Sequence, residues 1–112
     1  MSELNITSLY RCLADPQRLR ILNLLQAGSL CVCHLQDILE EKQVTVSKQL
    51  QYMRNLGLVE SRREGKWMHY SLSTPVHPLL LANLAGLKAF EQEYALFQAD
   101  TQRRADLMER CV

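Results

Sequence analysis

Two short amphipathic segments and the two β-prone runs that follow them most constrain the fold of this chain. The segments cover about residues 31–40 and 44–55, and each places its apolar side chains on one helical face. The runs 58–63 and 67–72 surround a Glu-Gly-Lys turn, so they predict a β-hairpin with a basic tip. Two helices joined by a tight turn and followed by such a hairpin predict a winged helix-turn-helix.

Further helices are expected on both sides of this unit. A first helix covers about residues 3–14, and Asp15-Pro16 precedes a second over residues 17–27, because Asp caps a helix and Pro suits its first turn. A long last helix, about 76–97, carries apolar residues on two sides. So small a domain cannot bury both sides, so we expect the first and last helices to form a homodimer interface.

Composition favours a globular protein without a membrane segment. The chain has 112 residues with 4 Gly and 3 Pro, and its longest apolar stretch, residues 79–87, is far shorter than the roughly 20 residues that span a bilayer. No secretory signal pattern is visible, so we expect a cytoplasmic protein. Four cysteines in that compartment favour metal binding or redox sensing over structural disulfides.

Positive charge is concentrated in the middle of the chain, although the net charge is only +1. Six basic and two acidic residues lie between Lys42 and Tyr70, which predicts a face for a polyanion. Glutamine side chains can hydrogen-bond to adenine edges, and hydroxyl groups can hydrogen-bond to bases or phosphates. Basic side chains neutralise phosphates or enter the minor groove. The candidate contacts to double-stranded operator DNA are Thr45, Ser47, Lys48, Gln49, Gln51, Arg54, Arg62, Arg63 and Lys66.

The predicted fold class is mainly α, within α+β: a winged helix-turn-helix of about five helices plus a two-stranded β-hairpin wing, assembled as a homodimer. We assign residues 1–98 to one DNA-binding and dimerisation domain. The polar residues 99–112 are expected to form a loosely held C-terminal tail.

Cys31 and Cys33 are the candidate ligands for a soft ion, because thiolates select thiophilic ions over calcium or magnesium. Residues two apart on an ideal helix do not face one another, so chelation by both is expected to require distortion of the helix that starts there. A bound ion would then move the neighbouring DNA-reading helix.

Two other functions are possible for these thiols. A redox or reactive-sulfur sensor on the same fold would use Cys31 or Cys33 in a disulfide or polysulfide, although a ring closed across one residue is strained. A thiol enzyme is not expected, because no orienting Asp or Asn and no evident substrate pocket accompany the cysteines and His34. A protein–protein module using the last helix is a further alternative, which failure to bind any promoter DNA would favour.

Several motifs, in order, resemble those of the ArsR/SmtB family of metal-responsive repressors. The run CLADPQRLRIL (12–22) resembles the family signature LADPTRLRIL, and TVSKQL (45–50) resembles the recognition helix TVSRHL. The LGLV and RREGKW runs resemble the family's wing, and LCVCHL (30–35) resembles the metal box of its arsenic and cadmium/lead branches. The resemblance covers about residues 12–72. It implies a homodimeric repressor, closest to the arsenic-responsive branch, that its ligand releases from an operator.

The resemblance implies As(III) or Sb(III) as the effector, with Cd(II), Pb(II) or Zn(II) also possible. The family's arsenic box has a third cysteine where this chain has Gln36, so a third thiol for a pyramidal As(III) centre must come from elsewhere. Cys111 is the preferred candidate, Cys12 is a weaker one that is better suited to the core, and the site can also lack a third thiol. His34 is expected to be exposed or to cap a helix, Arg18 to pair with Asp15 or a helix end, and Trp67 and Tyr70 to pack the wing onto the core.

Overall fold

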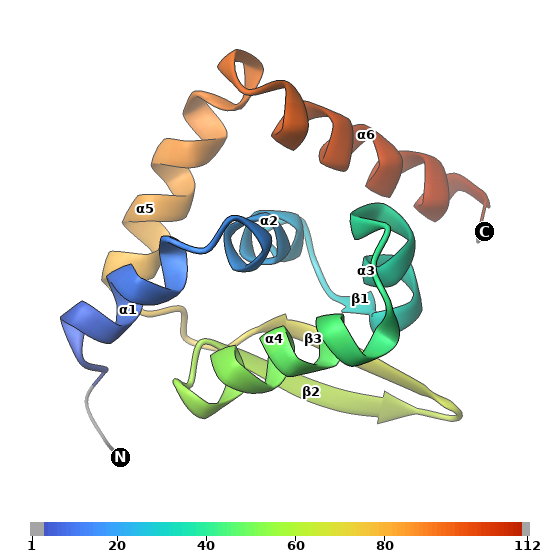
Figure 1. Cartoon of the computed structure of the whole chain (residues 1–112), viewed down its shortest axis with the longest axis horizontal. Coiled ribbons are helices and arrows are strands. Elements are labelled where there is room, and N and C mark those ends of the chain that lie inside the picture. The colour runs from blue at the N-terminus through green and yellow to red at the C-terminus, as the bar shows by residue number, and fades with distance from the viewer. Residues whose placement is uncertain (1–3, 111–112) are drawn as a thin grey trace.

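The computed structural model describes residues 4–110, and within that range it contains six α-helices, one 3-10 helix and three strands. In chain order these are α1 (Ile6–Leu13), α2 (Pro16–Leu25), β1 (Leu30–Cys31), α3 (Val32–Leu39), α4 (Gln43–Asn55), β2 (Val59–Glu64), β3 (Trp67–Leu72), α5 (Pro78–Ala89), η1 (Glu91–Glu93) and α6 (Ala95–Arg110). Helix α2 lies at the centre, with α1 and α5 on one side and α3 on the other (Figure 1). The sheet and α4 lie below α2, and α6 crosses above it. The predicted winged helix-turn-helix is confirmed.

Local sequence signals explain the first two helices. The side chain of Asn5 accepts a hydrogen bond from the Ser8 N–H, and that of Asp15 accepts one from the Arg18 N–H, so each caps a helix start. Pro16 occupies the first turn of α2, where its missing N–H costs nothing. Gly28, which follows α2, has a φ of 136°, a backbone conformation that strongly favours glycine.

The sheet has one strand more than the predicted hairpin. Leu30 and Cys31 pair antiparallel with β3, opposite Tyr70 and His69, and the strand order is β1-β3-β2. Both residues are buried. Cys31 therefore belongs to a strand, and α3 begins one residue later than predicted.

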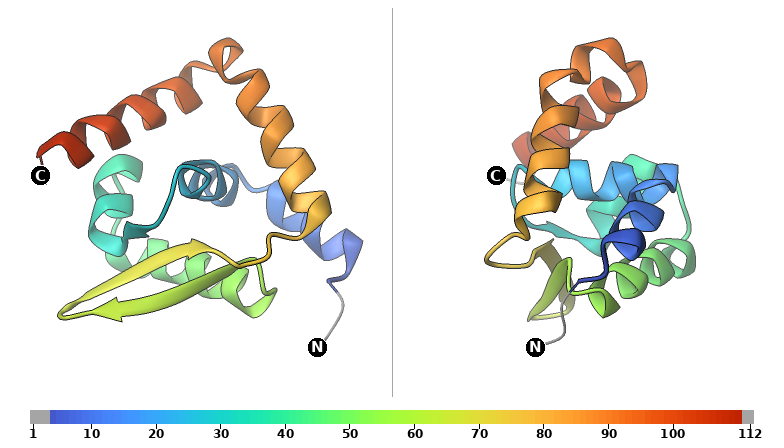
Figure 2. Two further views of the ribbon diagram at one scale, coloured as in Figure 1. Left: turned by 180° about the vertical axis from the view of Figure 1, so that it is seen from behind. Right: turned by 90° about the vertical axis from the view of Figure 1, so that its left-hand side faces the viewer.

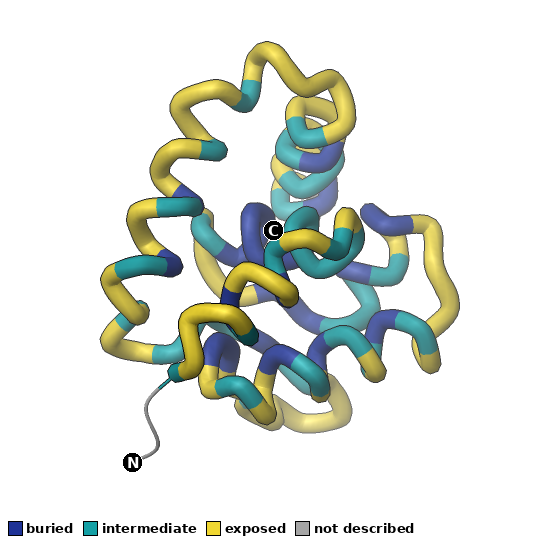
Figure 3. The backbone as a smooth tube through the Cα atoms, turned by 60° about the vertical axis from the view of Figure 1, so that its left-hand side comes forward, coloured by how far each residue is buried: buried dark blue, intermediate teal, exposed yellow. Residues whose placement is uncertain are grey.

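The core lies where α2, α3, α4 and the start of α5 meet the sheet. The tube in Figure 3 is buried along the inward sides of these elements and exposed along their outer sides. The buried apolar residues form one core cluster, and its members with almost no exposed surface are Leu9, Cys12, Ile21, Leu22, Leu30, Leu35, Ile38, Val46, Leu50, Met53, Leu80 and Leu84. Cys12 is thus the core residue that its sequence context favoured. No helix in the described part of the chain is long and apolar enough to cross a membrane.

The predicted helix over residues 76–97 is wrong as a single element. It breaks after Ala89, where Phe90 leaves helical geometry and the turn η1 reverses the chain into α6 (Figure 2). The prediction of a loose tail from residue 99 is also wrong for residues 99–110, which belong to α6. Periodicity does not reveal this, because α6 is mostly polar and is held by a few specific contacts.

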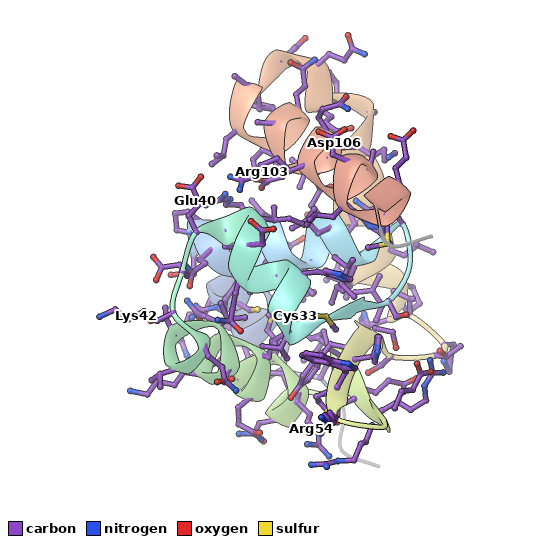
Figure 4. All side chains as sticks on the ribbon, turned by 90° about the vertical axis from the view of Figure 1, so that its right-hand side faces the viewer. Cys33, Glu40, Lys42, Arg54, Arg103 and Asp106 are labelled. Atoms are coloured by element: carbon purple, nitrogen blue, oxygen red, sulfur yellow. A yellow bond between two sulfur atoms is a disulfide. The ribbon has the colours of Figure 1, made fainter. Side chains whose placement is uncertain are left out.

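Those contacts run from α6 to α2 and α3. Arg20 donates two hydrogen bonds, each 2.9 Å, to the carboxylate of the buried Asp100. Arg103 donates to Glu40 at 2.6 Å and to the carboxylate and carbonyl of Asp37, which ties α6 to the end of α3 (Figure 4). Leu107 is buried in the core cluster, so the last turns of α6 are also anchored.

Asp100→Ala is expected to lower the free energy of unfolding by about 3 kcal/mol, because it leaves the part-buried guanidinium of Arg20 without its partner. Urea unfolding followed by circular dichroism measures this loss. Asp106→Ala is the matched control on the same helix: its carboxylate is exposed and accepts a hydrogen bond from Gln102 one turn away, so a change within about 0.5 kcal/mol is expected. Equal losses in both variants would contradict the stabilising role of the Arg20–Asp100 pair.

Candidate functional site

The two candidate ligand sulfurs lie at the junction of β1 and α3. Cys31 is the N-cap of α3 with extended backbone angles of −78° and 158°, and Cys33 lies in the first turn of the helix. The two sulfurs are joined as a disulfide across a Cα–Cα distance of 5.4 Å. The expectation that the sulfurs can meet only if the helix unwinds is therefore wrong, because Cys31 stands outside the helix.

His34 belongs to the same cluster. The sulfurs of Cys31 and Cys33 and a ring nitrogen of His34 all lie within 4.8 Å of one another. Cys31 is buried, whereas Cys33 and His34 are half-buried and give the cluster access to solvent. Figure 4 places Cys33 at the base of α3, beside the sheet. Sequence reasoning expected His34 to be exposed or to cap a helix and did not count it among the ligands.

The cluster is connected both to the wing and to helix α4. Through β1 it is hydrogen-bonded to β3 of the wing, where Cys31 lies opposite His69. Through α3 it is packed against α4, because Leu35 and Ile38 share the core with Val46 and Leu50. Cys31 is therefore linked to the wing by strand pairing and to α4 by the core residues of α3.

Cys12 and Cys111 are the two candidates for a third thiol ligand, and the structure describes only the first of them. Cys12 is fully buried in the core, and burial raises the pKa of its thiol more than the neighbouring Arg18 lowers it. A thiol held protonated in the core is a poor ligand for a metal ion. Cys111 lies outside the described residues.

Helix α4 displays most of the predicted DNA contacts on its outer surface. Lys48, Gln51 and Arg54 are exposed, and Thr45 and Ser47 are half-buried. Arg54 extends away from the body of the molecule near the wing (Figure 4). Three of the six predicted residues of α4 are therefore exposed to solvent, and their contacts with DNA stay a prediction.

Gln49 has a different environment. Its amide nitrogen donates to Asp15 at 3.1 Å and to Gln17 at 3.4 Å, and its oxygen accepts from Arg18 at 3.2 Å. These contacts fix the α4 side chain to the start of α2. Its predicted contact with adenine stays a prediction, and it would compete with this internal network.

Arg18 is a structural residue whose full role the sequence did not reveal. Its guanidinium donates to the carbonyls of Arg11 and Cys12 at the end of α1, and it lies 4.1 Å from the centre of the Tyr52 ring on α4. The predicted pairing with a helix end is confirmed. The additional contacts with Tyr52 and Gln49 make Arg18 a bridge between α1 and α4, which no local sequence signal indicates.

The wing carries the other predicted contacts. Arg62, Arg63 and Lys66 are exposed, and Arg62 forms an ion pair with Glu64, which also lies 3.5 Å from the imidazole of His69. Tyr70 is buried as predicted, but Trp67 is 57% exposed, so its predicted packing against the core is wrong. Trp67 and Glu64 pair at the end of the hairpin, too far along the strands to reach the core.

The helix pair, the exposed polar face of α4 and the basic wing define a winged helix-turn-helix DNA-binding protein. The match to the model of the arsR family of bacterial regulatory proteins covers residues 15–61. The chain is 36% identical over 102 residues to the arsenic resistance transcriptional regulator ArsR1 of Pseudomonas putida, covering 90% of this chain and 78% of that protein. It is 45% identical over 74 residues to the arsenical resistance operon repressor of Escherichia coli, covering 65% of this chain and 63% of that protein.

A solved structure has the same fold. It is the homodimeric winged helix-turn-helix DNA-binding domain of a possible ArsR-family transcriptional regulator from Mycobacterium bovis, with a TM-score of 0.64 and 28% identity. The match covers 80% of this chain and 81% of that one. The chain belongs to the arsR family of bacterial regulatory proteins, and its relatives are transcriptional regulators.

Gln49→Ala is expected to lower the free energy of unfolding by about 1 kcal/mol or more, because it removes part-buried hydrogen bonds to Asp15 and Arg18. Gln51→Ala is the matched control, since that amide is exposed and donates a hydrogen bond to Asn55 of the same helix. Thermal unfolding compares the two variants. Equal stability in both would contradict the structural role of Gln49.

Proposed function

We propose that this protein is a transcriptional repressor that leaves its operator when a thiophilic ion binds the thiolates of Cys31 and Cys33. The observation that carries the proposal is the convergence of the two sulfurs at a point hydrogen-bonded to the wing and packed against α4. The positive end of the α3 dipole favours negatively charged thiolates at this position. A repressor of this kind works in the cytoplasm, where its thiols are kept reduced.

The proposed coupling acts through β1. An ion requires specific angles at both sulfurs, and Cys31 cannot move its backbone without disturbing the pairing of Leu30 and Cys31 with Tyr70 and His69. The wing and α4 then change position relative to one another. The ligand shifts the balance between the two shapes only by the difference in its affinity for them.

As(III) or Sb(III) is the proposed effector, with Cys111 as the third thiol of a pyramidal centre. Two features support this choice: the named arsenic relatives, and the anchoring of the last turns of α6 by Leu107, which holds the chain against the body close to its C-terminal end. Cd(II), Pb(II) and Zn(II) are further thiophilic ions that the pair of thiolates suits.

The proposed DNA contacts follow from exposure and charge. Thr45, Ser47 and Gln51 face the major groove with the outer side of α4, and Lys48 and Arg54 neutralise phosphates. Arg62, Arg63 and Lys66 bring the wing to the backbone or the minor groove of the same operator. Gln49 joins them only if it exchanges its internal hydrogen bonds for an adenine.

The proposed homodimer uses α1 and α5, the described counterparts of the predicted first and last helices. Ile6 and Tyr10 lie one turn apart on α1 and are exposed, and the Tyr10 hydroxyl accepts a hydrogen bond from Asn83 on α5. A shallow groove runs between these helices and is lined by Tyr10, Leu13, Ala14, Leu19, Asn83 and Leu87. A second copy covers this apolar surface in the proposed assembly.

Cys31→Ser is expected to abolish the arsenite-induced loss of operator binding while DNA affinity without arsenite stays unchanged. Cys111→Ser is expected to weaken the response, because it removes one of three proposed thiols. Fluorescence anisotropy on the DNA upstream of the gene, with the protein kept reduced, measures both. Cys12→Ala is the control and keeps a full response, since that thiol is buried in the core. A normal arsenite response in Cys31→Ser would falsify the proposed function.

Ile6→Glu is expected to raise the dimer dissociation constant by at least about tenfold, because an unpaired carboxylate at an interface costs more than the 1.4 kcal/mol that tenfold represents. Sedimentation equilibrium measures the constant. Val44→Glu is the matched control, with the same change at a similarly exposed apolar residue on α4. The proposed interface is rejected if both variants dimerise as the parent protein does.

A further inference from the structure

We propose that Arg103 of α6 is a positioning residue for DNA binding, which holds the turn between α3 and α4 and so fixes the direction in which α4 starts. This inference rests on the proposed contacts of α4 with DNA and extends them to a helix that does not touch DNA. It is independent of the cysteines and of the effector, because it concerns the shape of the protein that binds the operator.

The turn between α3 and α4 is built on an unusual residue. Glu40, which ends α3, has left-handed φ and ψ angles of 55° and 47°, and it is the one described residue other than glycine with a positive φ. Its N–H donates to the Asp37 carbonyl at 3.3 Å, and the Glu41 N–H donates to the Gln36 carbonyl at 3.1 Å. These are the hydrogen bonds of a Schellman motif, in which glycine is usual because a side chain disfavours the left-handed conformation.

Arg103 supplies contacts that hold Glu40 in this conformation. Its Nη1 donates to the Glu40 carboxylate at 2.6 Å, and its Nη2 donates to the Asp37 carbonyl at 2.9 Å and to the Asp37 carboxylate at 3.3 Å. The guanidinium lies at the C-terminal end of α3, where the helix dipole favours a positive charge. Figure 4 shows Arg103 reaching from α6 toward Glu40. One side chain therefore binds both the end of α3 and the residue that turns the chain toward α4.

Arg103 is itself held by the anchored part of α6. Asp100, one turn earlier, is buried and pairs with Arg20 of the central helix α2. Leu107, one turn later, is buried in the core cluster. The turn between α3 and α4 is thus connected through Arg103 to the body of the domain.

The start of α4 depends on this turn more than on the core. Lys42 is the N-cap of α4, and its side chain makes no capping hydrogen bond. Val44, in the first turn of α4, is 63% exposed, and the helix first enters the core cluster at Val46. Thr45, a proposed base contact, lies in this first turn. Because recognition helices read bases with their N-terminal residues, a change in the direction of this turn is expected to weaken DNA binding.

The test compares Glu40→Ala with Glu40→Gly in the full chain. Both variants lose the carboxylate that Arg103 binds, but only glycine adopts the left-handed conformation without a steric cost. Glu40→Ala and Arg103→Ala are each expected to raise the dissociation constant for a duplex from the DNA upstream of the gene by about three- to fivefold, the range that ion pairs of this exposure contribute. Glu40→Gly is expected to keep the parent affinity, and adding Arg103→Ala to it is expected to change that affinity by less than about twofold.

Fluorescence anisotropy at several salt concentrations measures these constants, at a temperature at which circular dichroism shows the parent helix content for every variant. Arg103→Ala is expected to keep the parent salt dependence, because a positioning residue contacts no phosphate. A slope reduced by about one would instead show a direct phosphate contact and overturn the positioning role. Gln102→Ala is the matched control on α6, since that side chain is exposed, and it is expected to keep the parent affinity.

The remaining outcomes separate this inference from the proposed function. Parent affinity in Arg103→Ala overturns the inference and leaves the repressor proposal standing. Equal weakening in Glu40→Ala and Glu40→Gly also overturns it, because the left-handed turn is then not what Arg103 stabilises. If the parent protein does not bind the upstream duplex, the proposed DNA-binding function fails and this inference fails with it.

Discussion

The pairing of β1 with β3 is the interaction on which the rest of this molecule depends. It is only two residues long, yet it keeps Leu30 and Cys31 extended and buried, and it sets the point at which α3 begins. Without that pairing, Cys31 would continue the helix and its sulfur would point away from that of Cys33. The same hydrogen bonds join Cys31 to the wing. One short strand therefore provides both the geometry of the cysteine site and its link to the DNA-binding surface.

Helix α6 stabilises the C-terminal end of α3, the end away from the two cysteines. Its buried Asp100 neutralises Arg20 on α2, and its Arg103 bridges two acidic residues at the end of α3. The start of α3 is thus held by a strand and its end by a salt-bridged helix (Figure 4).

The sequence predicted the central part of the fold well and the ends poorly. The DNA-reading unit is carried by strong local signals: apolar residues at helical spacing in α4, the capping Asp15 with Pro16, and a glycine turn between two β-prone runs. The third strand was missed because two residues carry no periodicity, and their pairing depends on a partner about forty positions away. The docking of α6 was missed because it depends on a few specific contacts, such as the Arg20–Asp100 pair and the buried Leu107, and not on a periodic pattern.

The candidate site was predicted in the same uneven way. The two cysteines were found from their spacing and the resemblance, and the exposure of Lys48, Arg54 and the wing arginines agrees with their proposed roles. Gln49 was grouped with the base-reading residues because residues 49 and 51 look alike in sequence, whereas only the folded chain brings Asp15, Gln17 and Arg18 to one of them. His34 was set aside because the sequence favoured an exposed or capping role, whereas the folded chain brings a ring nitrogen of His34 within 4.8 Å of both sulfurs.

Arg18 has a consequence for the geometry of the whole assembly. It joins α1, a helix of the proposed interface between copies, to Gln49 and Tyr52 on α4. In the proposed dimer a two-fold axis would repeat any tilt of α4 against α1 in both copies, so the separation of the two α4 helices would change by twice the shift in one copy. Half-sites in a palindromic operator lie a whole number of DNA turns apart, so the contacts of Arg18 would help to set the spacing that the two copies can read.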